Sequence, residues 1–174
     1  MSKKFDTREL VQAALLLAVA VLLNFVAIYL GPSLKVSLAP CIVIFAGAYL
    51  GPGKGALVGG LSDVLVLLIK ALPGAYFPGF TLTMALYGFL GGVLLRSVRT
   101  RPSAARTIGS TLVIQSVCSL ALNTLWLTMT TGNPYGLLFV SRLPLTFISG
   151  AFYVAVLMVL FRYQAKILHH PAAS

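Results

Sequence analysis

The sequence predicts an all-α membrane protein with six transmembrane helices in one domain of 174 residues. Hydrophobic residues make up 59% of the chain and charged residues only 9%, so too few charges remain to cover a soluble globule. The apolar residues also form long runs, each near the ~20 residues that cross the hydrocarbon core of a bilayer. Gly and Pro separate these runs, as expected for turns between helices.

Six such runs follow one another along the chain. The second and third are short for a membrane crossing, and the first is too long for the apolar core of a cleavable signal peptide. Gly and Pro occur together in four of the five connections, which supports this division. The expected spans are residues 8–29, 34–50, 54–69, 77–95, 107–130 and 137–163.

The basic residues predict the orientation of the bundle. Ten of the thirteen lysines and arginines lie before the first span, in or next to the second and fourth connections, or at the end of the chain. The positive-inside rule therefore puts both termini in the cytoplasm. Because the charge follows this topology, it indicates orientation rather than a nucleic-acid-binding surface. The three exceptions, on the outer side, are Lys35, Lys70 and Arg142.

The chain lacks the residue clusters that catalysis or metal binding requires. Its acidic residues are Asp6, Glu9 and Asp63, and both histidines lie in the C-terminal tail. No GxxxxGK[ST] loop is present, so we expect no nucleotide hydrolysis by this chain, and no metal or cofactor. Cys41 and Cys118 lie in apolar runs without metal-type spacing and are expected to be buried free thiols.

Residues 76–83 depart from the apolar pattern with the sequence Tyr-Phe-Pro-Gly-Phe-Thr-Leu-Thr. The proline removes a backbone donor and the glycine exposes backbone, which membrane proteins tolerate only where protein or water covers it. The aromatic rings and threonine hydroxyls add stacking surfaces and hydrogen bonds. We therefore expect this stretch to border a cavity that opens to the outside. The residues expected to face a ligand there are Phe77, Pro78, Gly79, Phe80 and Thr81.

Arg142 lies five residues inside the last span, about 8 Å from its outer end. An arginine at this depth is a functional candidate, because leaving it in lipid is costly. Its planar guanidinium suits a carboxylate, and Pro144 favours a local opening beside it. The alternative is that Arg142 reaches the outer headgroups. Lys35 and Lys70 could add positive charge around the same opening, or simply face solvent.

Asn123 and Trp126 lie three residues apart on the fifth span, and therefore on one face of a helix. An indole beside an amide can stack on and hydrogen-bond a flat heteroaromatic ring. The alternative is an interfacial tryptophan with an inter-helix hydrogen bond. Asp63, ~12 Å inside the third span, leaves a similar choice between a proton-coupling role and a structural hydrogen bond or ion pair.

Small residues recur at four-residue spacing on three spans and leave flat strips where another helix can approach closely. Such pairs most often serve packing within the same protein, but one of them can instead be a docking face for another subunit. The pairs are Ala14/Ala18 (with Ala13 beside them), Gly55/Gly59 and Gly88/Gly92.

Together these features resemble the substrate-binding S components of energy-coupling factor (ECF) transporters. The general likeness covers residues 8–165, with six short helices, an Ala-Ala-x-x-x-Ala pattern at residues 13–18 and an outward-facing cavity. A likeness to the folate-specific S components rests on more specific segments. These are Phe-Pro-Gly-Phe-Thr-Leu at 77–82, Tyr-Gly-x-x-Gly at 87–91, Asn-Thr-Leu-Trp-Leu at 123–127, and Arg142.

The resemblance implies a vitamin-capture subunit, not an enzyme, in the plasma membrane of a prokaryote. It would bind folate from outside and deliver it by reorienting in the membrane against a transmembrane coupling subunit of the EcfT type. Two ECF ATPase subunits would supply the energy. On the same basis Ala13, Ala14 and Ala18 would face the coupling subunit. The residues expected to bind the ligand are those at 77–81 together with Lys35, Asn123, Trp126 and Arg142.

Folate suits this set, because its flat rings match aromatic side chains and its two carboxylates match an arginine. Two alternatives stay open. The same architecture could serve another vitamin, such as pantothenate, nicotinate or a thiamine precursor. The chain could also be a membrane assembly factor that binds no small ligand.

Overall fold

The computed structural model describes residues 7–26, 28–31, 34–70, 77–98 and 103–169, and helices make up most of them. A 3-10 turn, η1 (Arg96–Val98), follows the fourth helix, and a π-helix, η2 (Ser116–Leu122), joins the fifth to the sixth. The α-helices are α1 (Thr7–Phe25), α2 (Ala39–Leu50), α3 (Pro52–Lys70), α4 (Pro78–Leu94), α5 (Ala104–Gln115), α6 (Asn123–Thr131) and α7 (Tyr135–His169).

Among the described residues, six helical segments are apolar enough to be membrane helices. Four are at least 19 residues long, namely Thr7–Phe25, Pro52–Lys70, Ala104–Thr131 and Tyr135–Gln164. The third of these contains α5, η2 and α6, which run on from one another without a break. The shorter α2 and α4 are the other two. The predicted fold class, a six-helix membrane bundle, is confirmed.

A short β-hairpin lies where the sequence predicts the end of the first span and the start of the second. Strand β1 (Ile28–Gly31) pairs antiparallel with β2 (Leu34–Val36), so that Ile28 lies opposite Val36. The predicted spans 8–29 and 34–50 are therefore wrong at these ends: α1 stops at Phe25 and α2 starts at Ala39. Pairing between the two strands satisfies backbone donors and acceptors of this segment that no helix satisfies.

Glycines hold α2, α3 and α4 unusually close together. A Cβ added to Gly88 would lie 2.0 Å from the carbonyl oxygen of Gly55, and one added to Gly47 would lie 1.9 Å from that of Gly88. Such distances leave no room for any side chain, so the backbones of the three helices touch. The pairs Gly55/Gly59 and Gly88/Gly92 thus serve packing within the chain.

Helix α1 covers α2 and α3 with one face and leaves the other open. Ala20 and Asn24 are buried on the inner face, and Lys54 of α3 forms an ion pair with Glu9. Ala14 and Ala18 lie on the exposed face, while Ala13 is half-buried. The alanine strip of α1 is therefore not used for packing within the described part of the chain, unlike the glycine pairs.

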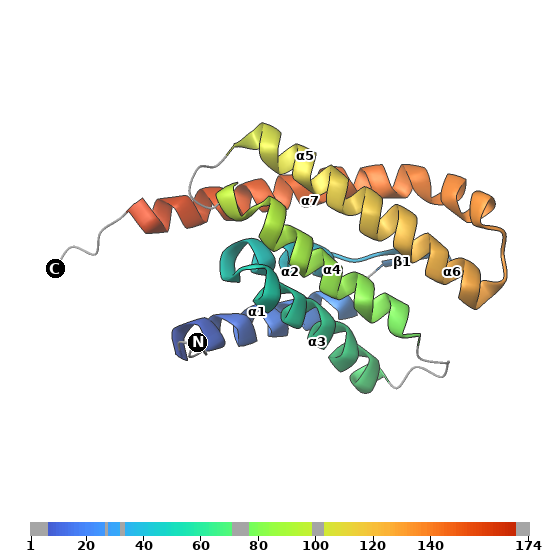
Figure 1. The fold of residues 1–174 in the computed structure, drawn as a ribbon, viewed down its shortest axis with the longest axis horizontal. Coiled ribbons are helices and arrows are strands. Elements are labelled where there is room, and N and C mark those ends of the chain that lie inside the picture. The colour runs from blue at the N-terminus through green and yellow to red at the C-terminus, as the bar shows by residue number, and fades with distance from the viewer. Residues whose placement is uncertain (1–6, 27, 32–33, 71–76, 99–102, 170–174) are drawn as a thin grey trace.

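Helix α4 runs between two groups of helices (Figure 1). Helices α1 and α3 lie on one side of it, and α5, α6 and α7 lie on the other. The start of α1 and the end of α7 lie at one end of the bundle, to the left in Figure 1. The start of α4 and the end of α6 lie at the opposite end, and this second end carries the candidate site.

Candidate ligand-binding site

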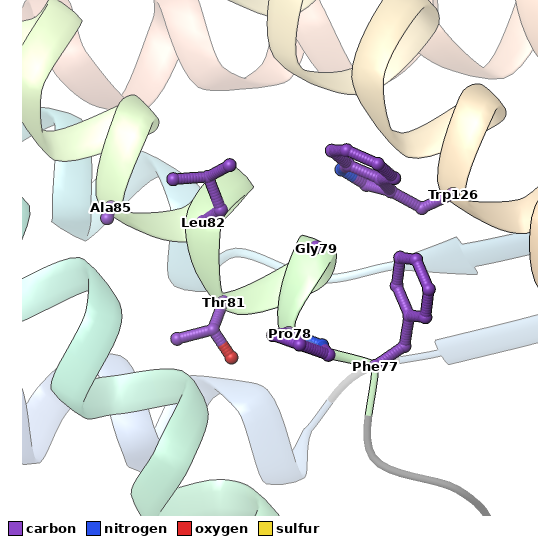
Figure 2. Close-up of a pocket in the computed structure, with 7 residues that line it drawn as sticks. All are labelled: Phe77, Pro78, Gly79, Thr81, Leu82, Ala85 and Trp126. Atoms are coloured by element: carbon purple, nitrogen blue, oxygen red, sulfur yellow. The ribbon is translucent and has the colours of Figure 1, made fainter.

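A cavity of about 640 Å³ opens where α4 begins and α6 passes it (Figure 2). Its volume is in the range of small-molecule pockets, and most of its lining is apolar. The lining residues are Phe77, Pro78, Gly79, Thr81, Leu82, Ala85 and Trp126. Five of the residues that the sequence analysis names as ligand-facing thus surround one space.

The first turn of α4 forms one wall of this cavity. Phe77 has extended backbone and precedes the helix, and Pro78 occupies the first helical turn, where its missing N–H costs nothing. The carbonyl of Gly79 accepts a hydrogen bond from the Thr83 hydroxyl, at 3.0 Å. Pro78 and Gly79 therefore form the first turn of α4, within the expected span 77–95. The carbonyl of Gly79 is hydrogen-bonded and is not the exposed backbone that the sequence analysis expects.

Aromatic rings meet over Gly79. The rings of Phe77 and Trp126 lie 5.5 Å apart between centroids, inclined by 50°, and Phe80 packs edge-on to Phe77 at 6.0 Å. A Cβ on Gly79 would lie 2.5 Å from the ring of Phe77 and 2.6 Å from that of Trp126. Figure 2 shows both rings beside the bare Cα of this glycine. Gly79 is thus the residue that lets α6 place its indole against α4.

Asp63 is tied to the cavity through Thr81. The hydroxyl of Thr81 donates to Oδ2 of Asp63, at 2.7 Å, and so links α4 to α3. In Figure 2 the side chain of Thr81 points away from Trp126, toward the α3 side. Of the two roles considered for Asp63, the structural hydrogen bond is the one that the structure contains.

Polar groups continue from the cavity into the bundle along one face of α4. Thr83 lies one turn beyond Gly79 and Tyr87 one turn beyond Thr83, and both are buried. The hydroxyl of Tyr87 donates to Oε1 of Gln115, at 2.7 Å, and Nε2 of Gln115 donates to Ser149, at 3.1 Å. This chain of hydrogen bonds joins α4, α5 and α7 below the cavity.

Arg142, Asn123 and Phe80 are not among the residues that line the cavity. Arg142 lies about 10 Å along α7 from Tyr135 and is half-buried. Within the described residues it has no hydrogen bond or ion pair. Asn123 begins α6, one turn before Trp126, and its backbone N–H donates to the carbonyl of Cys118. Both therefore belong to the helices beside the cavity, not to its wall.

Of the two lysines expected on the outer side, the structure describes the side chain of Lys70 but only the backbone of Lys35. Nζ of Lys70 donates to the backbone carbonyl of Asn24, at 3.2 Å, and lies 4.9 Å from the centroid of the Phe25 ring. Lys70 thus fastens α3 to α1, and of the two alternatives for it, that it simply faces solvent is wrong. The backbone of Lys35 pairs with Tyr29 in the hairpin, and its side chain lies outside the described part.

The described residues contain no group of three or more His, Cys, Asp or Glu side chains that could hold a metal ion. Cys41 and Cys118 are buried free thiols, as predicted. The arrangement therefore offers stacking surfaces and a few hydrogen-bonding groups, which suits the capture of a flat organic molecule.

Comparison with known proteins decides the family. The family model described as "ECF transporter, substrate-specific component" matches residues 8–164, which is nearly all of the chain. The chain belongs to this family of ECF substrate-specific components. It is accordingly a multi-pass protein of the cell membrane, in agreement with its apolar helices.

Two similar proteins carry more detail. The folate transporter FolT of Clostridium novyi (strain NT) is 34% identical to this S component over 112 residues, which are 64% of this chain and 63% of that relative. The matched region thus spans less than two thirds of the relative. A crystal structure of FolT bound with folic acid has a TM-score of 0.81 and 27% identity, covering 91% of this chain and 95% of that one.

Sequence reasoning missed Ala85, which lines the cavity of this S component. It placed Leu82 and Thr83 in the stretch that borders the cavity without naming either as a site residue, and it gave Tyr87 no role, although Leu82 lines the cavity and Thr83 and Tyr87 are buried on α4 beyond it. Leucine, alanine and threonine occur throughout the apolar spans, so their type carries no signal. The four-residue spacing of Gly79, Thr83 and Tyr87 was the one available clue, because it places them on one helix face.

Proposed function

We propose that this chain captures folate from outside the cell as the substrate-binding subunit of an ECF transporter. The observation that carries the proposal is the likeness to FolT bound with folic acid over 91% of the chain. The partial match to a second FolT supports it. The aromatic wall built by Phe77 and Trp126 agrees with a ligand that contains a flat pterin and an aminobenzoyl ring.

The proposed site comprises the cavity wall of α4 and α6, with Arg142 and Asn123 beside it. Arg142 would bind a carboxylate of the glutamate moiety, since this half-buried arginine has no hydrogen bond or ion pair within the described residues. Lys35 would add positive charge from the hairpin. Phe80 would act behind Phe77 by fixing its ring.

The transport cycle is proposed from the family. The S component would deliver folate by reorienting against a transmembrane coupling subunit, and two ATPase subunits would hydrolyse ATP, so this chain needs no catalytic residue of its own. Ala13, Ala14 and Ala18 would face the coupling subunit, which agrees with the exposed strip on α1. Both termini would lie in the cytoplasm, because Arg8, Lys54, Arg106 and other cations flank the end of the bundle opposite the cavity.

Thermal unfolding of the purified protein tests the ligand. A ligand that binds only the folded state stabilises it by about 2.7 kcal/mol at one hundred times its Kd. Folate should raise the unfolding temperature, whereas pantothenate, nicotinate and thiamine precursors should leave it unchanged. A rise with one of these vitamins and none with folate would assign the same architecture to that vitamin. No rise with any of them would favour the assembly-factor alternative.

A further inference from the structure

The indole N–H of Trp126 is already bonded within the protein. Nε1 of Trp126 donates to the hydroxyl oxygen of Thr83, at 3.0 Å, and that hydroxyl donates in turn to the carbonyl of Gly79, at 3.0 Å. Thr83 is only 1% exposed, so water does not compete for these bonds. The chain of two hydrogen bonds ties α6 to the first turn of α4.

Two further contacts leave the indole little freedom. The ring of Phe77 packs against it from one direction, and the missing Cβ of Gly79 lets it rest on the α4 backbone from another. Figure 2 shows the indole reaching from α6 across to Gly79 with its nitrogen on the α4 side. One edge of the ring system is therefore committed to the protein, while Trp126 still lines the cavity.

We infer that Thr83 is a positioning residue for ligand binding: it fixes the indole of Trp126 so that its ring, and not its N–H, is offered to the ligand. The identity of the ligand rests on the proposed function, but the position of the indole does not. A side chain that is ordered before binding does not have to be ordered by the ligand, so pre-positioning strengthens binding. The same bond excludes Trp126 as a hydrogen-bond donor to the ligand.

The chain contains one tryptophan, so its fluorescence reports on this site alone. Thr83→Val removes the hydroxyl at nearly constant shape, and Thr83→Ser keeps it. Thr128→Val is the matched control, because Thr128 lies on α6 two residues from Trp126 and bonds the carbonyl of Thr124 instead. The measurements are the anisotropy decay of the indole and its quenching by acrylamide, both without ligand, followed by the Kd for folate.

Thr83→Val should increase the local motion and the quenching of the indole, while Thr83→Ser and Thr128→Val should match the unsubstituted protein. The Kd for folate should rise about threefold to tenfold in Thr83→Val only. An indole that stays as immobile and as protected in Thr83→Val would overturn the inference. Should Thr83→Val fail to fold, Thr83→Ala carries the same test and the same expected outcomes.

The two proposals can fail separately. If the unsubstituted protein does not bind folate but Thr83→Val still frees the indole, then Thr83 positions Trp126 and the ligand is a different one. If folate binds and Thr83→Val changes neither the motion of the indole nor the Kd, then the transport function holds and the positioning role of Thr83 is refuted.

Discussion

At the scale of single residues, the contact between Gly79 and Trp126 shapes the cavity wall. The indole can reach the α4 backbone only because residue 79 has no Cβ, and that contact places an aromatic ring in the cavity wall. The sequence contains both residues in segments that it marks as unusual, so their participation could be predicted. Their contact could not, because Gly79 and Trp126 are 47 positions apart and only the packing of α6 on α4 joins them.

Arg142 carries the sharpest prediction at this scale. Arg142→Ala should weaken folate binding about 10- to 100-fold, because a charge-assisted hydrogen bond contributes about 1.5–3 kcal/mol. The affinity of Arg142→Lys for folate should lie between those of Arg142→Ala and the unsubstituted protein, since an ammonium keeps the charge but loses the paired N–H donors of the guanidinium. Isothermal titration calorimetry gives the Kd values. Arg162→Ala, on the same helix near its other end, is the control and should bind normally. If Arg142→Ala binds folate normally, Arg142 does not contact the ligand, and the alternative that it reaches the outer headgroups remains.

At the scale of elements, the close approach of α2, α3 and α4 depends on glycines that α3 and α4 present at four-residue spacing. This spacing is visible in the sequence and correctly indicates close helix packing. The hairpin and the π-helix are not visible in the same way. Strands of four and three residues form through pairing with each other, and the π-helix Ser116–Leu122 lies where the chain packs on α4 and α7, far away in the sequence.

Two adjacent glycines of α3 test this packing. A Cβ on Gly59 would lie 2.2 Å from the carbonyl oxygen of Met84, whereas one on Gly60 would meet its nearest atom, Cβ of Ala85, at 3.8 Å. Gly59→Ala should therefore lower the free energy of unfolding by about 1–3 kcal/mol, and Gly60→Ala should not lower it, because alanine fits there and favours the helix by up to about 1 kcal/mol. Unfolding in mixed micelles measures both. Equal stabilities would show that α3 and α4 can separate without loss.

Substitutions in the alanine strip of α1 test whether this surface binds the coupling subunit. Substitution of both Ala14 and Ala18 by Trp should abolish co-purification with the coupling subunit and ATPases, because bulky rings would hold another helix away. Folate binding should persist, since both positions are exposed and far along the chain from the cavity residues. Val159→Trp, at an exposed position of α7, is the control for added bulk and should leave the complex intact. Lost folate binding would show instead that the strip packs internally.

At the scale of the whole molecule, the sequence was most informative where chemistry repeats over many residues. Apolar runs and turn residues predicted the six helices, and the distribution of cations predicts an orientation that agrees with the single end at which α1 starts and α7 stops. The general likeness over residues 8–165 led to the family, whose model matches residues 8–164, and the motifs at 77–82 and 123–127 led to its folate-specific members. The cavity itself depends on how those helices cross, and so the cavity lining needed the structure.

The central claim is that folate occupies the cavity beside Trp126, and a fluorescence titration tests it most directly. Because Trp126 is the one tryptophan, folate bound against it should quench the emission along a saturable curve. Free N-acetyltryptophanamide at equal absorbance corrects for light taken up by the ligand. The account predicts saturation at one folate per chain and weaker binding in Arg142→Ala. Quenching no greater than that of the free indole would contradict it.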